Sequence, residues 1–252
     1  MPNNRVAIIA ALPGELKPLV RGWQRESRNG VHLWRWTHDE GEWLAGCAGA
    51  GLDAATRAFA EIEKHGPLNI AISIGWAGAL QKRFAAGKAF AISSILDAKT
   101  GEHFKTAGEE DGCMLVTSPK VADEAEKRRL AATYQAGLVD MEAAAIARLS
   151  QMRGIPFYCV KGVSDSLKDK LPDFNRFISK HGQFKLSQFV FFALLHPRYW
   201  RTLIRMGENS KRAAQSIAES LLNFLDPKGE IRKRNGYPNF KYRNPNQKRN
   251  SR

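Results

Sequence analysis

The chain has 252 residues, 43% of them hydrophobic, which is enough for one well-buried core, so a single globular domain is the default expectation. No apolar run reaches the roughly 18 to 20 residues that crossing a bilayer requires, and the N-terminal apolar run is too short for a signal peptide. We therefore expect a cytoplasmic protein.

The formal charge of +14 is concentrated at the C-terminus. Residues 227–252 hold nine Lys or Arg and one Glu, or +8, which leaves +6 for the other 226 residues. Because this segment is rich in Asn and Pro and lacks apolar periodicity, we expect a basic disordered tail after a domain spanning residues 1–226. Such a tail either aids solubility or contacts an anionic surface, and we expect no specific nucleic-acid partner.

The residues that most often bind metals or form disulfides show no such pattern here. Cys47, Cys113 and Cys159 are widely separated and lie in apolar, strand-like contexts, which is typical of reduced core thiols. The histidines lack ligand spacing and there is no C-x-x-C motif. We expect neither a metal nor a cofactor.

Alternating apolar runs and helical patterns predict an α/β protein with a mixed, mostly parallel central sheet flanked by helices. Strands are predicted at 5–12, 68–80, 90–99, 112–118 and 155–165, with a hairpin at 31–49. Helices are predicted to begin at Pro13 and to occupy 49–66, 121–134 and 143–154.

Two carboxylates are predicted at strand ends within residues 137–166. One strand is predicted to end on Met141-Glu142 and a second on Ser164-Asp165, with a helix between them. Such a unit implies parallel strands, and ligands bind at the carboxyl ends of parallel strands. An alternative is that Glu142 only caps a helix and Asp165 only forms a turn.

Two Gly-rich turns, at 49–51 and 75–78, could bind a ligand oxygen through free amides or could simply be tight turns. Neither turn matches the P-loop or a complete dinucleotide motif.

Four segments together resemble the nucleoside phosphorylase and nucleosidase superfamily, which includes methylthioadenosine/S-adenosylhomocysteine nucleosidases. They are VAIIAALPGEL, AGAGLDAATRA, ISIGWAGAL, and VDMEAAAIA with IPFYCVKGVSDS, and they cover roughly residues 5 to 180. The MEAAA motif, followed by the Ser-Asp pair about twenty residues later, is the most specific part. The resemblance implies the fold of that superfamily and an enzyme that cleaves nucleosides, commonly as a homodimer.

The resemblance also implies roles for individual residues. Asp165 would protonate the purine, Glu142 would hold the ribose hydroxyls, and Glu15 would position the attacking water. Met141 would pack on the ribose and Ser164 would orient the acid. The remaining expected substrate-binding residues are Trp76, Gly78, Val121 and Phe174.

The chain departs from the pattern at two places. Ser73 and Trp76 stand where related phosphorylases carry a phosphate-binding arginine and serine, which favours water over phosphate as the nucleophile, although Arg21 or Arg57 could substitute. Pro119 to Ala122 replace the aromatic residue that usually stacks on adenine, so that the identity of the base is open, with adenine the better guess.

The segment 184–205 combines an apolar, aromatic-rich run with arginines. It reads either as a core-facing helix with a subunit contact, or as a peripheral contact with an anionic membrane that also involves the basic tail. In the second case the chain would resemble the hopanoid-associated nucleoside phosphorylases, which act on a lipid adenosyl nucleoside.

Three functions therefore stand after the sequence. The first is hydrolysis of a 5'-substituted purine nucleoside, with adenine the favoured base, that uses Glu15, Glu142 and Asp165. The second is phosphorolysis, including the lipid-nucleoside version. The third is a non-catalytic module that binds nucleic acid or membrane through its tail.

Overall fold

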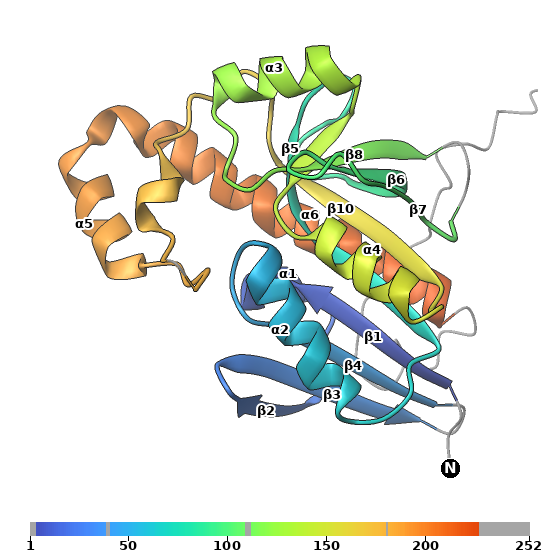
Figure 1. The fold of residues 1–252 in the computed structure, drawn as a ribbon. Helices are drawn as coiled ribbons and strands as arrows, with labels where there is room; N and C mark the ends of the chain where they lie inside the picture. The colour runs from blue at the N-terminus through green and yellow to red at the C-terminus, as the bar shows by residue number, and fades with distance from the viewer. Residues whose placement is uncertain (1–3, 39–40, 109–111, 180, 227–252) are drawn as a thin grey trace, which may run out of the picture.

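The computed structural model describes residues 4–38, 41–108, 112–179 and 181–226, and the predicted disordered tail lies outside them. Strands alternate with helices along the chain, as the sequence predicted (Figure 1). The strands are β1 Asn4–Ala10, β2 Gln24–Arg28, β3 Val31–His38, β4 Gly41–Cys47, β5 Ile70–Ala79, β6 Ala89–Asp97, β7 His103–Lys105, β8 Cys113–Thr117, β9 Leu138–Asp140 and β10 Phe157–Asp165. The helices are α1 Pro13–Leu16, α2 Leu52–Glu63, α3 Glu124–Tyr134, α4 Ala143–Met152, α5 Leu186–Leu195 and α6 Trp200–Leu225, with 3₁₀ turns η1 Phe174–Phe177 and η2 Pro197–Tyr199.

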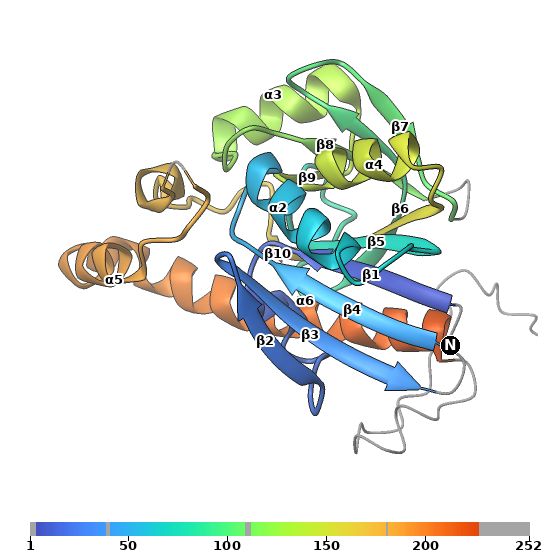
Figure 2. The same ribbon diagram turned by 60° about the horizontal axis from the view of Figure 1, so that its bottom comes forward.

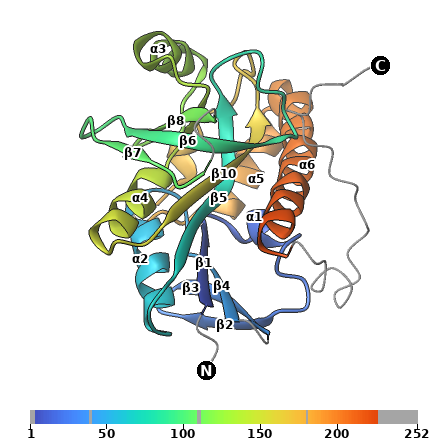
Figure 3. The ribbon, with the colours of Figure 1, turned by 90° about the vertical axis from the view of Figure 1, so that its right-hand side faces the viewer.

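The expected mixed α/β fold is confirmed. Strands β4, β1, β5 and β10 pair in parallel through the centre, and β3 and β2 extend the sheet by antiparallel pairing. At the other end, β5, β9, β8, β6 and β10 pair in a closed ring, because β10 pairs with both β5 and β6. Figure 3 shows the long strands β5 and β10 running side by side from one part of the sheet into the other.

Helices cover both faces of the sheet (Figures 2 and 3). Helices α2 and α4 pack against one another and contribute Phe59 and Ile146 to the larger core cluster. Helix α6 runs along β10 on the other face, where Ile217 and Leu221 are buried among the strands. Gly162 permits this contact, since a Cβ there would lie 2.8 Å from the Ala213 Cβ.

Two details of the predicted elements are wrong. Strand β9 ends at Asp140, so Met141 and Glu142 lie just beyond it, and β9 runs antiparallel to β5 whereas β10 runs parallel to it. The 138–165 segment is therefore not a simple parallel βαβ unit. The helix expected from Pro13 is a single turn, because Pro18 has no amide to continue it.

The three cysteines are buried and free, as the sequence indicated. Burial raises the pKa of Cys47 and Cys159 to about 12 and that of Cys113 to about 11. Thiols of this kind are poor nucleophiles at neutral pH.

The prediction of a core-facing helix within 184–205 is also wrong. Helix α5 has no buried residue and projects away from the sheet with η2 and the first turns of α6 (Figures 1 and 2). Its inner face packs on η1 in a cluster of rings, where Phe177 lies 5.5 Å from Phe189 and 5.3 Å from Phe192 between centroids. None of the helices in the described ranges is long and apolar enough to cross a membrane.

Candidate active site

The two predicted carboxylate motifs meet at Gly78 of β5. Gly78 pairs with Val139 of β9 on one side and with Asp165 of β10 on the other, so the ends of both strands lie beside the same residue. A Cβ at Gly78 would lie 3.0 Å from the Lys127 Cε and 3.3 Å from the Asp165 Oδ2. A glycine is needed here because the space of a side chain is occupied by an ion pair.

A cavity of about 1370 Å³ opens at this point. It is lined by eight of the nine residues predicted to form the site: Trp76, Gly78, Val121, Met141, Glu142, Ser164, Asp165 and Phe174. Residues almost a hundred positions apart in the sequence thus line the same cavity. The ninth, Glu15, is not among the lining residues, but its neighbours Leu12, Gly14 and Trp76 are.

Glu142 does not act as a helix cap, which removes one of the alternatives left open by the sequence. Its side chain accepts a hydrogen bond at 2.7 Å from the Gly51 amide, at the start of α2, and α4 is capped instead by Asp140, which accepts from the Ala143 amide at 2.9 Å. Burial and the nearby negative charge of Asp140 raise the pKa of Glu142 to about 8. The turn at 49–51 therefore serves to hold this carboxylate.

Glu15 is 3% exposed and sits at the ends of β1 and β5. One carboxylate oxygen accepts from the Ala11 and Leu12 amides at 2.8 and 2.7 Å, and the other accepts from the Trp76 amide at 2.7 Å. Each carboxylate oxygen can accept two hydrogen bonds, so one acceptor position remains for a water. Burial raises the pKa of Glu15, although these hydrogen bonds partly offset it.

Asp165 forms its polar contacts with side chains rather than with a turn. Ser164 donates to its Oδ1 at 2.5 Å. The Lys127 ammonium donates to its Oδ2 and also to the Ser166 carbonyl at 2.8 Å. The Lys127 side chain is only 2% exposed, so this ion pair is buried.

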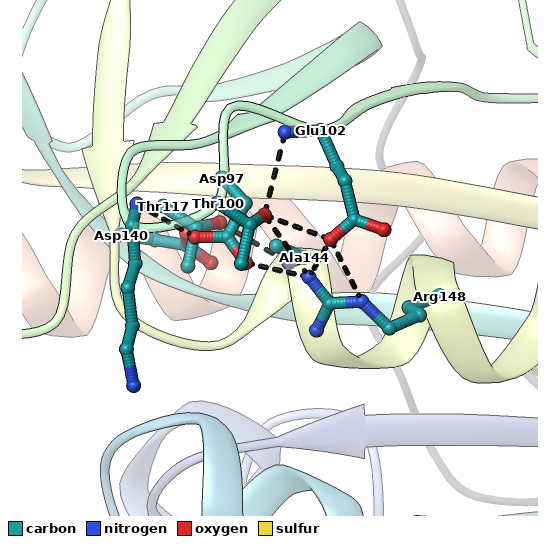
Figure 4. A network of polar contacts seen from close by, with 8 residues as sticks. Asp97, Thr100, Glu102, Thr117, Asp140, Ala144 and Arg148 are labelled. Carbon is teal, nitrogen blue, oxygen red and sulfur yellow. Dashed lines mark hydrogen bonds and ion pairs between the residues drawn. The ribbon is translucent and has the colours of Figure 1, made fainter.

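A second buried ion pair joins Lys161 of β10 to Asp140, with 2.8 Å between Nζ and Oδ2. Burial alone would lower the pKa of Lys161, but the nearby charge of Asp140 and the hydrogen bond to it outweigh burial and raise the pKa. Figure 4 shows the other side of Asp140, where Thr117 donates to it at 2.7 Å and accepts from the Ala144 amide at 3.1 Å.

The same close-up shows how α4 is held on its outer side. Arg148 donates to Asp97 at 2.7 Å and to Glu102 at 2.5 Å (Figure 4). Asp97 ends β6, so this bridge joins the helix to the ring of strands. Helix α4, whose first residue follows Glu142, is thus fixed by Asp140 at its first amide and by Arg148 on its outer side.

Lys127, Asp140 and Lys161 were missed by sequence reasoning. Lys161 had a signal, because a lysine within the apolar strand FYCVKGVSD requires a buried partner. Asp140 directly precedes the Met-Glu pair and could have been suspected on that ground. No such signal in the sequence marked Lys127, because it is one of several cations on a charged helix.

Trp76 lies in the cavity wall rather than in the core. Its indole nitrogen donates to the Ser210 carbonyl of α6 at 2.9 Å, and its ring comes within 3.0 Å of where a Gly14 Cβ would stand. Ser73 is fully buried and does not line the cavity. Of the two arginines considered as substitutes for a phosphate ligand, Arg21 lines the cavity, while Arg57 donates to the Ala48 and His181 carbonyls.

Comparisons with known proteins show what the sequence and the fold of this chain are similar to. A family model described as "Phosphorylase superfamily" matches residues 109–190, which include Met141, Glu142, Ser164 and Asp165. The matched segment, about a third of the chain, is similar to the phosphorylase superfamily. The expected family, and with it the expectation of a nucleoside-processing enzyme, is confirmed at this level. No curated protein matches the chain.

Solved structures support the same fold over nearly the whole chain. The methylthioadenosine/S-adenosylhomocysteine nucleosidase of Helicobacter pylori aligns with a TM-score of 0.67 at 13% identity, over 90% of this chain and 100% of that one. The corresponding nucleosidase of Neisseria meningitidis aligns at 0.67 and 17% identity, over 89% and 99%. The futalosine hydrolase of Helicobacter pylori aligns at 0.66 and 14%, over 89% and 98%. At these identities the likeness establishes the superfamily's fold.

Within the described ranges no group of three or more His, Cys, Asp or Glu is arranged to hold a metal ion.

The raised pKa of Glu142 predicts a pH dependence of stability. Between about pH 4.5 and pH 8 the folded protein retains this proton while the unfolded chain has released it, so the free energy of unfolding falls as the pH rises. Glu142→Gln cannot ionise and should flatten this fall, by on the order of 1 kcal/mol per pH unit. Urea unfolding across this range measures it.

Glu102→Gln is the matched control. Arg148 and Thr100 lower the pKa of Glu102, so its contribution changes below about pH 4.5 and the slope at higher pH should stay as in the wild type. Identical slopes for the wild type and Glu142→Gln would contradict the assignment.

Proposed function

We propose that this protein cleaves the N-glycosidic bond of a purine ribonucleoside and that water is the nucleophile. Adenine is the proposed base. One observation supports this most directly. A single cavity brings together Glu142 and the Asp165–Lys127 pair, with the Glu15 carboxylate directly behind its wall. The solved relatives named for hydrolysis of methylthioadenosine, S-adenosylhomocysteine and futalosine share the fold.

In this reaction the bond between C1' of the ribose and N9 of the base breaks, and its electron pair goes to the base. Asp165 gives a proton to N7, so that the base leaves as a neutral molecule. Glu142 accepts hydrogen bonds from the ribose hydroxyls, and its ionised form, which becomes populated as the pH approaches its pKa of about 8, stabilises the oxocarbenium-like sugar. Water held by Glu15 adds to C1' and passes its proton to that carboxylate, whose raised pKa suits a base working near neutral pH.

Lys127 extends this scheme. Its ammonium donates to the same carboxylate that must protonate the base, and it is sealed from solvent by its burial. In the ion pair Asp165 is a carboxylate and the Lys127 ammonium holds the proton, so Nζ passes a proton to Oδ2 as the Asp165 carboxyl group protonates N7, and Lys127 becomes neutral. Once the base has left, the pair regains a proton through Asp165, which lines the cavity. We therefore assign Lys127 as the residue that positions and recharges the general acid.

Phosphorolysis is the second candidate, and the cavity gives it one argument. Lys17, Arg21 and Arg25 line the cavity and are exposed, so an anion could be held at its rim. The buried carboxylates Glu15 and Glu142 argue against a phosphate dianion deeper in, next to C1'.

A large apolar 5' substituent is supported by the size and lining of the cavity. Its volume exceeds the roughly 300 to 1,000 Å³ of most small-molecule sites. An apolar part of its lining comes from η1, α5 and α6 and includes Phe174, Phe189, Leu203 and Met206. A substituent larger than a methylthio group, including a lipid adenosyl nucleoside, would fill this extension.

The homodimer and the cytoplasmic location expected from the sequence stay predictions. Sedimentation of the purified full chain measures the first, and fractionation of cells that express it measures the second.

Product analysis tests the function. Methylthioadenosine, adenosylhomocysteine, adenosine, inosine and 5'-alkylthioadenosines of increasing chain length are each incubated with and without phosphate. We expect adenine and free ribose products without phosphate, with kcat/KM rising with chain length. Asp165→Asn should lower kcat by about 10² to 10⁴-fold. Because it also leaves the buried Lys127 ammonium without its partner, kcat is compared at a temperature at which circular dichroism shows the variant to be folded.

Strict dependence on phosphate would establish phosphorolysis and remove the water role of Glu15. Near-normal turnover by Asp165→Asn would refute the acid assignment. If no nucleoside releases its base, the protein is a non-catalytic binding module.

Glu15→Gln separates binding from chemistry. Gln keeps an acceptor for the backbone amides but cannot take a proton, so kcat should fall by about 10²-fold or more with KM within a few-fold of the wild type. Steady-state kinetics with the best substrate of the panel measures both. A rise in KM at constant kcat would instead mean that Glu15 only binds substrate.

Lys127→Met and Lys127→Arg test the positioning role. Met leaves Asp165 without its cation and should lower kcat and shift the pH profile of kcat, whereas Arg restores the charge and should recover part of the rate. Lys120→Met, at an exposed residue that also lines the cavity, is the control and should change neither. An unchanged pH profile in Lys127→Met would leave the lysine a purely structural role.

A further inference from the structure

The apolar surface of the protein is concentrated in one projecting segment. Nine large hydrophobic side chains in the described ranges are exposed, and seven of them lie within residues 186–204. We call these seven the apolar knob: Leu186, Val190, Phe191, Leu194, Leu195, Trp200 and Ile204. Single exposed hydrophobic residues are ordinary, but a contiguous group of this kind marks a surface that something covers.

The knob is the outer face of a segment whose inner face is already packed. Phe177, Phe184 and Phe189 form the ring cluster that joins α5 to η1. Phe191 and Leu194 point away from that cluster, with 65% and 64% of their surface exposed. The knob therefore projects beyond the body of the protein (Figures 1 and 2).

Charge indicates what the knob meets. Residues 174–207 contain no Asp or Glu, while Lys185, Arg198, Arg201 and Arg205 are exposed around the knob. The Arg198 guanidinium lies 4.8 Å from the Tyr199 ring, and Arg205 is paired with Asp169, outside this segment. Two copies facing each other through this segment would bring cation against cation, which disfavours a self-interface.

We propose that the knob docks into the surface of an anionic lipid bilayer. A convex apolar tip with helical backbone, bordered by cations and by Tyr199 and Trp200, matches what an interfacial element requires: apolar side chains enter the acyl boundary and the cations meet the headgroups. Leu186 belongs to both the knob and the cavity lining, so docking places that wall of the cavity at the bilayer. This proposal does not depend on the reaction that the site performs.

Vesicle binding of the full chain tests it. Phosphatidylcholine vesicles with phosphatidylglycerol should sediment the wild type, and vesicles without it should sediment far less. Leu194→Glu should weaken binding by at least about tenfold, because it removes an exposed apolar side chain that docking would bury and adds a charge of the wrong sign. Met152→Glu, at a side chain that is 74% exposed on α4, is the matched control and should bind as the wild type.

Trp200 reports the depth of docking. It is 47% exposed, so its emission should shift to the blue on vesicles and this shift should be absent in Trp200→Phe. Equal binding by Leu194→Glu and the wild type would overturn the proposal, because the basic tail present in both would then suffice. Failure of the wild type to bind either vesicle, with Leu194→Glu converting an oligomer to a monomer, would overturn it in favour of an interface between copies.

Discussion

The buried ion pair between Lys161 and Asp140 is the constraint on which the site depends. Both side chains are sealed from water, so removing either partner would leave an uncompensated buried charge, at a cost of about 3 to 5 kcal/mol. Asp140 uses its other acceptor positions to hold Thr117 and the first amide of α4. One carboxylate thereby ties together β8, β10 and the helix that begins after Glu142.

Because Asp140 caps α4, the Glu142 side chain can form other contacts. A glutamate at the start of a helix would ordinarily satisfy the free amides of the first turn, but Asp140 has taken this part. The Glu142 side chain instead reaches the amide of Gly51, from the turn before α2, and faces the cavity. Of the two Gly-rich segments predicted to be turns, residues 49–51 form a turn whose Gly51 amide binds Glu142. The prediction for residues 75–78 is wrong, because they continue β5 in register with β10, and from this strand the Trp76 amide donates to Glu15.

Which parts of the fold and of the site could be predicted from the sequence depended on whether the interactions are local or long-range along the chain. Apolar runs predicted the central strands because burial in a parallel sheet is written into local composition, whereas the polar edge strand β2, QRESR, carries no such signal. The motif MEAAA with its later Ser-Asp pair indicated which residues share a cavity. The Lys127 contact could not be predicted, because it depends on the Lys127 side chain of α3 reaching Gly78 and Asp165, and no local pattern in the sequence records that long-range contact. The exposure of α5 was also hidden, since an apolar helix reads alike whether it is buried or projecting.

The distribution of charge explains why the proposed chemistry favours a cationic sugar over an anionic nucleophile. Four carboxylates, Glu15, Asp140, Glu142 and Asp165, are buried at the site against two buried ammonium groups, Lys127 and Lys161. Each lysine is already paired with one aspartate, so Glu15 and Glu142 have no ion pair of their own. Burial is the main cause that raises the pKa of both, and an ionised Glu15 or Glu142 is an uncompensated negative charge. A positive charge developing on the ribose would relieve it, whereas a phosphate dianion would add to it. The remaining cations of the cavity are exposed residues at its rim, Lys17, Arg21, Arg25, Lys120 and Lys211, where solvent screens them from C1'.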